Sequence, residues 1–203
     1  MSPSGKGQDT SDLRAKWDKR YSDSNPYPPP AAVLSENLHL LPRRGRALDL
    51  ACGLGANALR LAEHGLDVVA WDLSSVAVER LEREAAARGL RIETRVRDVC
   101  AFPPEPGGFD VVIVSHFLER DLAPTLMGAL RPGGLIFYQT FSREAVTDCG
   151  PSNPDFRLAG NELLDLFRPL LVRFYREEGW AGDPTLGTRD VAQLVAQKPL
   201  CRS

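Results

Sequence analysis

Hydrophobic positions alternate between two patterns from residue 46 to residue 141. Short, nearly continuous apolar runs are typical of strands that are buried on both faces of a sheet. The segments between them place apolar residues on one side at helical spacing. We expect strands at 46–51, 66–72, 91–96, 109–114 and 135–141, and helices at 56–64, 74–88 and 121–130. Strands separated by helix-length segments predict right-handed crossovers and a parallel sheet.

The two ends of the chain show other patterns. At the N-terminal end, 12–21 is expected to form a short helix, 25–30 is rich in proline and extended, and 31–41 is helical. At the C-terminal end we expect a loop at 142–158, a short helix at 161–167, and strands at 170–178 and 189–198. The glycine-rich connection between these last strands is too short for a helical crossover, so they are predicted to be antiparallel.

The sequence therefore predicts an α/β fold. Its sheet has seven strands, is mostly parallel with an antiparallel C-terminal strand, and carries helices on both faces. Residues 1–10 are polar and small, which is typical of a disordered tail. Residues 11–203 are expected to form a single domain, in which 11–45 is an N-terminal helical region.

Composition narrows the class of protein. The chain has 203 residues, 43% hydrophobic and 26% charged, as expected for one globular domain. Its net charge of −2 favours a small-molecule partner, so we expect neither nucleic acid nor a membrane as a partner. The four cysteines (Cys52, Cys100, Cys149 and Cys201) lack metal-ligand spacing. We expect reduced thiols, no metal and a cytoplasmic location, because there is neither an apolar leader nor a long apolar run.

A glycine loop lies between the first strand and the first helix of the alternating region. In ALDLACGLGANA, Gly53, Gly55 and Ala58 match the pattern G-x-G-x-x-G/A. Asp72 ends the next strand, where a carboxylate is placed to bind ribose hydroxyls. The pattern suits either a dinucleotide or S-adenosylmethionine, and a purely structural turn is the other reading.

Three features favour S-adenosylmethionine. Asp49 precedes Gly53 by four residues, and a carboxylate there would repel a pyrophosphate but suits an ammonium group. We expect no separate catalytic domain after the nucleotide-binding half, because the 203 residues leave no room for one. The antiparallel pair at the end is not part of an ordinary dinucleotide fold. An NAD-dependent oxidoreductase stays open as an alternative.

These residues resemble the class I methyltransferases. D-x-A-C-G-x-G at 49–55 is similar to their first motif, with Ala51 where a glycine is usual. VVAWDLS, RVRDV, FDVVIVSHFLER and LRPGG resemble the segments that follow. The N-terminal W-D-x-R-Y at 17–21 and GPSNPDF at 150–156 resemble the tellurite-resistance and thiopurine-type group of small methyltransferases. The resemblance implies a Rossmann-like fold and S-adenosyl-L-methionine as the cofactor, with S-adenosyl-L-homocysteine as the product.

The resemblance also implies roles for individual residues. Asp49 would hold the methionine part of the cofactor, and Leu73 would pack on the adenine. Asp98 would accept from the adenine amino group and Val99 would donate its backbone N–H, although Asp98 also suits a plain turn. The full set of expected cofactor-binding residues is Trp17, Tyr21, Asp49, Ala51, Gly53, Gly55, Asn57, Asp72, Leu73, Asp98, Val99, Ser115 and His116.

Three further expectations concern the substrate side. His116 follows the fourth strand and is the candidate catalytic residue, as a general base, or else a wall of the cofactor pocket. Trp17 and Tyr21 would close over the cofactor as a lid, or would only pack an N-terminal helix. Arg120 and Arg143 flank the expected entrance and suit an anion, or are simply exposed.

The expected function is a methyltransferase that acts on a small-molecule acceptor by in-line displacement. The acceptor is a thiol, chalcogen oxyanion, amine or hydroxyl group. A nucleic-acid substrate is disfavoured because SHFL stands where an N/D-P-P-Y/F motif would lie. A non-catalytic module that binds the cofactor is the remaining alternative. The sequence leaves the acceptor and the oligomeric state open.

Overall fold

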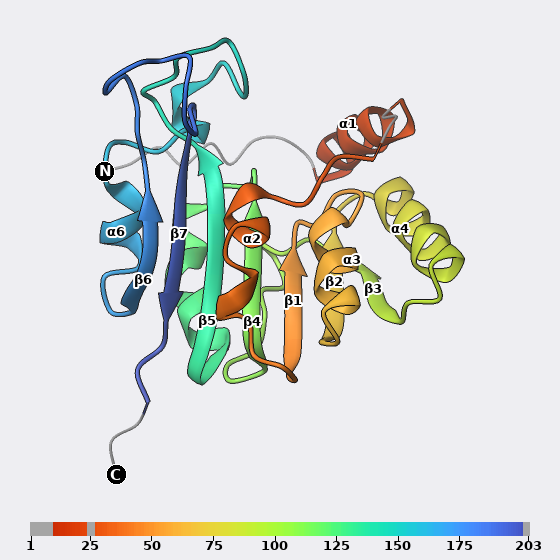
Figure 1. Cartoon of the computed structure of the whole chain (residues 1–203). Helices are drawn as coiled ribbons and strands as arrows, with labels where there is room; N and C mark the ends of the chain where they lie inside the picture. Colours follow the sequence, from red (N-terminus) through yellow and green to blue (C-terminus); the bar gives the residue numbers. More distant parts are fainter. Residues whose placement is uncertain (1–9, 24–26, 201–203) are drawn as a thin grey trace.

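Seven strands form one mixed sheet in the computed structural model, which describes residues 10–23 and 27–200. The sheet order is β3-β2-β1-β4-β5-β7-β6 (Figure 1). Neighbouring strands are parallel from β3 to β5, and β7 is antiparallel to both β5 and β6. The strands are β1 Arg46–Leu50, β2 Asp67–Asp72, β3 Ile92–Val96, β4 Phe109–Ser115, β5 Leu130–Phe141, β6 Leu171–Arg176 and β7 Val191–Gln197. The expected α/β fold is confirmed, including its antiparallel C-terminal strand.

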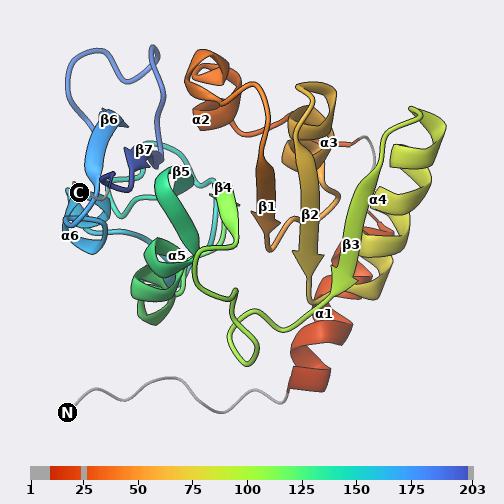
Figure 2. The same ribbon diagram turned by 90° about the horizontal axis from the view of Figure 1, so that it is seen from below.

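Helices cover both faces of this sheet (Figure 2). α2, α3 and α4 lie on one face, and α5 and α6 lie on the other. The helices are α1 Thr10–Ser22, α2 Ala32–Ser35, α3 Ala56–Glu63, α4 Ser75–Ala87, α5 Ala123–Ala129 and α6 Glu162–Leu166, with short 3-10 turns at Leu38–Leu40, Arg120–Leu122 and Pro154–Phe156. Within the described ranges, no helix combines the length and the apolar character that crossing a bilayer requires.

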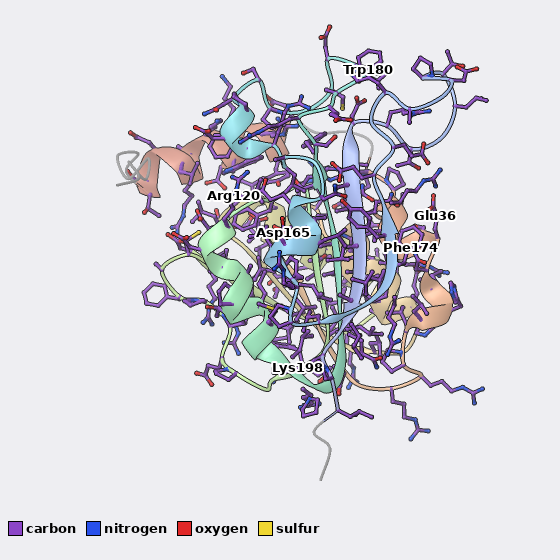
Figure 3. All side chains as sticks on the ribbon, turned by 90° about the vertical axis from the view of Figure 1, so that its left-hand side faces the viewer. Glu36, Arg120, Asp165, Phe174, Trp180 and Lys198 are labelled. Carbon is purple, nitrogen blue, oxygen red and sulfur yellow. The ribbon has the colours of Figure 1, made fainter. Side chains whose placement is uncertain are left out.

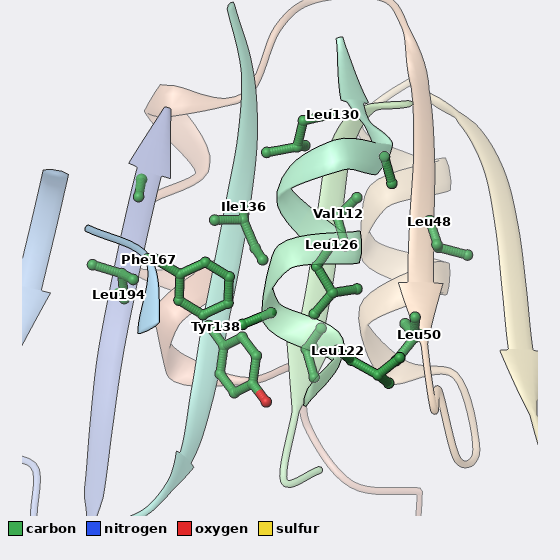
Figure 4. Close-up of a cluster of buried hydrophobic side chains, with 14 of the residues drawn as sticks. Leu48, Leu50, Val112, Leu122, Leu126, Leu130, Ile136, Tyr138, Phe167 and Leu194 are labelled. Carbon is green, nitrogen blue, oxygen red and sulfur yellow. The ribbon is translucent and has the colours of Figure 1, made fainter. Parts of the chain in front are cut away.

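The core consists of two apolar layers, one on each side of the sheet. Successive strand residues point to opposite faces, so Ala47 joins one layer while Leu48 joins the other. Figure 4 shows the layer under α5, where Tyr138 and Phe167 pack with rings 5.4 Å apart. Burial on both faces explains why the strands are continuous apolar runs.

The N-terminal region differs from the expectation in two places. The helix expected at 31–41 is divided into α2 and the 3-10 turn at 38–40. Asn37 lies between them, and its side-chain amide donates to the Val33 carbonyl (3.0 Å), which competes with continuation of the helix. α1 already begins at Thr10, inside the expected tail, and residues 1–9 of that tail lie outside the described residues.

The fifth strand is longer than expected. β5 begins at Leu130, so the RPGG segment that precedes the strand expected at 135–141 is part of the strand. Leu130 pairs with Phe109, and the register shifts before Leu135 pairs with Val111. Gly133 adopts a φ of +82° within this irregularity, a conformation that glycine accepts readily.

Candidate functional site

The glycine loop turns sharply between β1 and α3, at the carboxyl end of the parallel strands. Ala51, Gly53 and Gly55 have φ values of +55°, +53° and +76°. A Cβ at Gly55 would lie 2.4 Å from Leu81 Cδ1, and a Cβ at Gly53 would lie 2.9 Å from the Tyr21 hydroxyl. Both glycines are therefore required by conformation and by close packing. Ala51 adopts the left-handed region despite its side chain.

Asp49 is fully buried at the start of this loop. Its Oδ2 accepts a hydrogen bond from the Ala58 backbone N–H (2.9 Å), whereas Oδ1 is buried without a partner. Burial is the main reason why its pKa rises to about 8, against the opposing effect of the Ala58 hydrogen bond. A carboxyl group held this way would be stabilised in its ionised form by a cation.

Asp72 is turned toward the backbone of the loop. Its Oδ2 accepts from the Gly53 N–H (2.7 Å) and its Oδ1 accepts from the Ser74 N–H (2.9 Å). Burial raises its pKa. Each oxygen keeps a second lone pair, so the expected ribose role stays a prediction. The carboxylate also has a structural role, because it joins the ends of β1 and β2.

α1 lies against the glycine loop, although none of its residues is fully buried. Trp17 and Tyr21 stack with ring centroids 5.7 Å apart. Asp18 accepts from the Ser74 hydroxyl (2.5 Å) and the Val76 N–H (3.3 Å), and the Arg80 guanidinium donates to the Tyr21 carbonyl. Burial raises the pKa of Tyr21. Asp18 was not among the expected residues, and whether α1 acts as a lid stays a prediction.

The segment after β3 supports the turn reading of Asp98. Its Oδ1 accepts from the backbone N–H groups of Cys100 (3.0 Å) and Ala101 (3.2 Å). Val99 is buried and Leu73 is half-buried. The Asp98 side chain therefore shapes the turn, and its expected contact with adenine stays a prediction.

Polar side chains gather at the ends of β4 and β5. Asn57 donates to the Ser115 hydroxyl (2.9 Å) and accepts from the Ala31 N–H (2.8 Å). His116 has a φ of +55°, and its backbone N–H donates to the Gln139 carbonyl (2.8 Å). The His116 ring lies 5.0 Å from that of Phe141, and the residue as a whole is exposed. Gln139 was missed because it interrupts the apolar run of its strand only once.

Two expected entrance residues have structural contacts. The Arg120 guanidinium pairs with Glu162 (2.5 Å) and donates to the Asp155 and Arg157 carbonyls. Figure 3 labels Arg120, which precedes α5. The Arg143 Nε donates to the Pro154 carbonyl (3.3 Å). The N–H groups of Arg120 are already directed at protein oxygens. The expectation that Arg120 offers an open site for an anion is therefore wrong.

Residues 142–158 and 177–190, here called the cap loops, rise beyond the carboxyl ends of the parallel strands (Figure 1). Asp190 fastens the first loop by accepting from the Val146 and Thr147 backbone N–H groups and from the Thr147 hydroxyl (2.6 Å). Burial acts to raise the pKa of Asp190, but these hydrogen bonds outweigh it and the pKa is lowered. Arg157 is buried and donates to the Pro151, Ser142 and Cys149 carbonyls.

Comparison with known proteins identifies the family of this site. The model of the methyltransferase-domain family matches residues 47–134, which span β1 to the start of β5 and include the glycine loop. This stretch of the chain is similar to methyltransferase domains, as the resemblance of the glycine loop predicted. The cofactor expected for this domain, S-adenosyl-L-methionine, is confirmed with the family.

Curated relatives match about half of the chain. A ubiquinone biosynthesis O-methyltransferase from Methylocella silvestris is 39% identical over 103 residues, covering 48% of this chain and 40% of that protein. A tRNA 5-carboxymethoxyuridine methyltransferase from Escherichia coli K12 is 33% identical over 110 residues, covering 48% and 41%. The chain thus spans less than half the length of these relatives.

The tRNA methyltransferase corrects one expectation. We expected no nucleic-acid partner because the net charge is −2, and this exclusion is wrong. A chain-wide charge does not describe the local surface that meets a substrate, and a relative of the same domain acts on tRNA.

Solved structures share the fold of the methyltransferase domain over most of its length. The protein in "Conversion of a Disulfide Bond into a Thioacetal Group during Echinomycin Biosynthesis" superposes with a TM-score of 0.68 at 25% identity, covering 94% of both chains. TehB from Haemophilus influenzae superposes with a TM-score of 0.65 at 23% identity, covering 91% of this chain and 66% of TehB. The TehB likeness concerns the fold alone.

Proposed function

We propose that this protein transfers the methyl group of S-adenosylmethionine to a small-molecule acceptor. The observation that carries the proposal is Asp49, a buried carboxyl group at the glycine loop with one unpartnered oxygen. An unpartnered buried oxygen is costly, and a ligand ammonium group would satisfy it. When bound, the cofactor supplies a methyl group on a positively charged sulfur, which is already a good leaving group.

The chain's own residues would bind and align the reactants. Asp49 would hold the ammonium group, and Asp72 would use its remaining lone pairs for the ribose hydroxyls. Leu73, Asp98 and Val99 would surround the adenine. The other expected contacts would come from the loop and strand ends, at Ala51, Gly53, Gly55, Asn57, Ser115 and His116. Alignment and exclusion of water would supply several kcal/mol of the rate enhancement, up to about 7–11 in ideal cases.

Trp17 and Tyr21 are proposed to cover the bound cofactor. Tyr21 already lies against Gly53, and α1 is attached to the start of α4 through Asp18. An aromatic pair also suits the positive charge of the sulfonium. In this proposal residues 11–203 act as one domain, with 11–45 as its covering region.

A thiol is the first acceptor to test. The structure that covers 94% of this chain bears a title about conversion of a disulfide into a thioacetal, which is chemistry at sulfur. A thiolate is a strong nucleophile and needs no general base. A tRNA acceptor is the second candidate, favoured by the 33% identity to the tRNA methyltransferase.

Two measurements test the proposal. Calorimetric titration of the full chain with S-adenosylhomocysteine is expected to show binding, and Asp49→Asn is expected to weaken it at least tenfold. Labelled S-adenosylmethionine is then offered with thiols, phenols, amines, chalcogen oxyanions and bulk tRNA. Binding without turnover on any acceptor would favour the non-catalytic alternative. Absence of binding by a folded sample would refute the proposal, and binding of a nicotinamide cofactor instead would favour an oxidoreductase.

A further inference from the structure

The Gln139 side chain lies among three polar neighbours at the buried end of β5. Its Oε1 accepts from the Val33 backbone N–H (3.0 Å) and from the Gln193 side-chain amide (3.1 Å). Its Nε2 lies 3.5 Å from Nε2 of the His116 ring. Gln139 is 6% exposed and Gln193 is fully buried, so this arrangement has little room to change.

The Val33 N–H determines which way the Gln139 amide points. A side-chain amide can be turned over to exchange its oxygen and nitrogen, but a backbone N–H is always a donor. The Gln139 atom that faces Val33 must therefore be the oxygen. The Gln139 NH₂ group must then face His116, whatever the orientation of Gln193.

This orientation limits where the His116 proton can be. An amide NH₂ can only donate, so the His116 Nε2 that faces it must accept. A neutral imidazole carries one proton, which must then be on Nδ1. We propose that Gln139 is a positioning residue that holds His116 as the neutral Nδ1–H tautomer, so that His116 donates a hydrogen bond to the ligand and is not a general base.

Other features of His116 agree with this assignment. Partial burial of the ring lowers the pKa of His116, which favours the neutral form. The backbone N–H of His116 is bonded to the Gln139 carbonyl (2.8 Å), so one residue fixes both the main chain and the ring. The His116 residue keeps exposed surface, so in this proposal Nδ1–H meets an oxygen, nitrogen or sulfur lone pair of a bound molecule.

The tautomer of His116 follows from protein atoms alone. Only the nature of the ligand that accepts from His116 rests on the proposed function. With Nε2 occupied by Gln139, the expected general base is replaced by a fixed donor. A donor orients an acceptor group beside the reacting atom but does not remove a proton from it. The best acceptor is then one that needs no base, such as a thiolate.

Nitrogen-15 NMR of the histidine-labelled full chain, without cofactor or acceptor, tests the tautomer directly. The chain has three histidines, and His116→Asn identifies the His116 signals by their loss. We expect Nε2 of His116 to give the signal of an unprotonated ring nitrogen at neutral pH and Nδ1 that of a protonated one. The opposite assignment in the wild-type protein would overturn the proposal without any further variant.

Gln139→Glu and Gln193→Met form the matched pair. In Gln139→Glu the new carboxylate would still accept from Val33 and Gln193 but could not donate, so we expect Nε2 of His116 to become protonated. Gln193→Met leaves the Val33 N–H in place, and the wild-type tautomer should persist. An unchanged His116 tautomer in Gln139→Glu would show that Gln139 does not set it. If this variant does not fold, Gln139→Met should give a mixture of tautomers, and a single Nδ1–H form would count against the proposal.

These results are independent of the proposed methyl transfer. Binding of S-adenosylhomocysteine is measured separately by calorimetry. A correct tautomer in a protein that does not bind the cofactor would refute the proposed function and leave the Gln139 inference standing. The opposite tautomer in a protein that binds the cofactor would refute the Gln139 inference and leave the proposed function standing.

Discussion

Replacement of Asp49 by asparagine should change how stability depends on pH. The pKa of Asp49 rises from 3.8 to about 8 on folding, chiefly because the group is buried. A raised pKa means that the folded state keeps a proton that the unfolded state has released. The free energy of unfolding is therefore highest, as far as Asp49 determines it, below about pH 4. This contribution is lost as the pH rises toward 8.

The size of the effect follows from the pKa values. Each pKa unit corresponds to about 1.4 kcal/mol, so ionising Asp49 costs the folded protein on the order of 5 kcal/mol. Between pH 5 and pH 7 the slope approaches a loss of about 1.4 kcal/mol per pH unit. The side-chain amide in Asp49→Asn could still accept from the Ala58 N–H and would not ionise. The variant should therefore gain stability relative to the wild type by roughly 2–3 kcal/mol over this range.

Urea unfolding of both proteins without cofactor, at several pH values from 5 to 8, measures this difference. Asp183→Asn is the control, because hydrogen bonds from Thr185 lower the pKa of that exposed carboxylate. Its removal should matter only toward acidic pH and in the opposite direction. A constant difference between wild type and Asp49→Asn from pH 5 to pH 8 would refute the reasoning.

Three further substitutions test the loop and the cap. Gly55→Ala would place a Cβ 2.4 Å from Leu81 at a φ of +76° and should cost about 2–4 kcal/mol in urea unfolding. Gly89→Ala has a similar φ of +66° but open space, so it should cost clearly less, and an equal cost would show that contact with Leu81 is not the cause. Ala51→Gly should raise the melting temperature, since it relieves a left-handed alanine that costs about 1–2 kcal/mol, and a lower melting temperature would contradict this. Arg157→Met leaves three carbonyls without their donor and should speed proteolysis within 142–158, whereas an unchanged cleavage rate would show that Arg157 does not hold the loop.

The sheet and the glycine loop could be predicted because their signals are local. Continuous apolar runs identify strands buried on both faces, and the spacing from Asp49 to Gly55 identifies the turn between β1 and α3. The place of β7 between β5 and β6 was not part of that prediction. Strand order depends on packing between distant segments, which periodicity does not encode.

The polar contacts of the site could not be predicted in the same way. Asp72 was expected to face a ligand, but its oxygens also accept from Gly53 and Ser74, on segments separated in sequence. Gln139 lies in an apolar strand, and its partners Val33 and Gln193 come from opposite ends of the chain. Such contacts exist only after the sheet has assembled, so no spacing along the chain indicates them.

The position of β7 affects the order in which the protein can be completed during synthesis. β7 is the last of the seven strands of this sheet to leave the ribosome, yet it lies between β5 and β6 and is the sheet neighbour of both. Until it emerges, β6 has no partner strand among the described residues, and β5 keeps an open edge from Leu135 to Phe141. A nascent chain that pauses before Val191 would expose this edge to other chains, so late translation is the stage at which this fold most needs protection from aggregation.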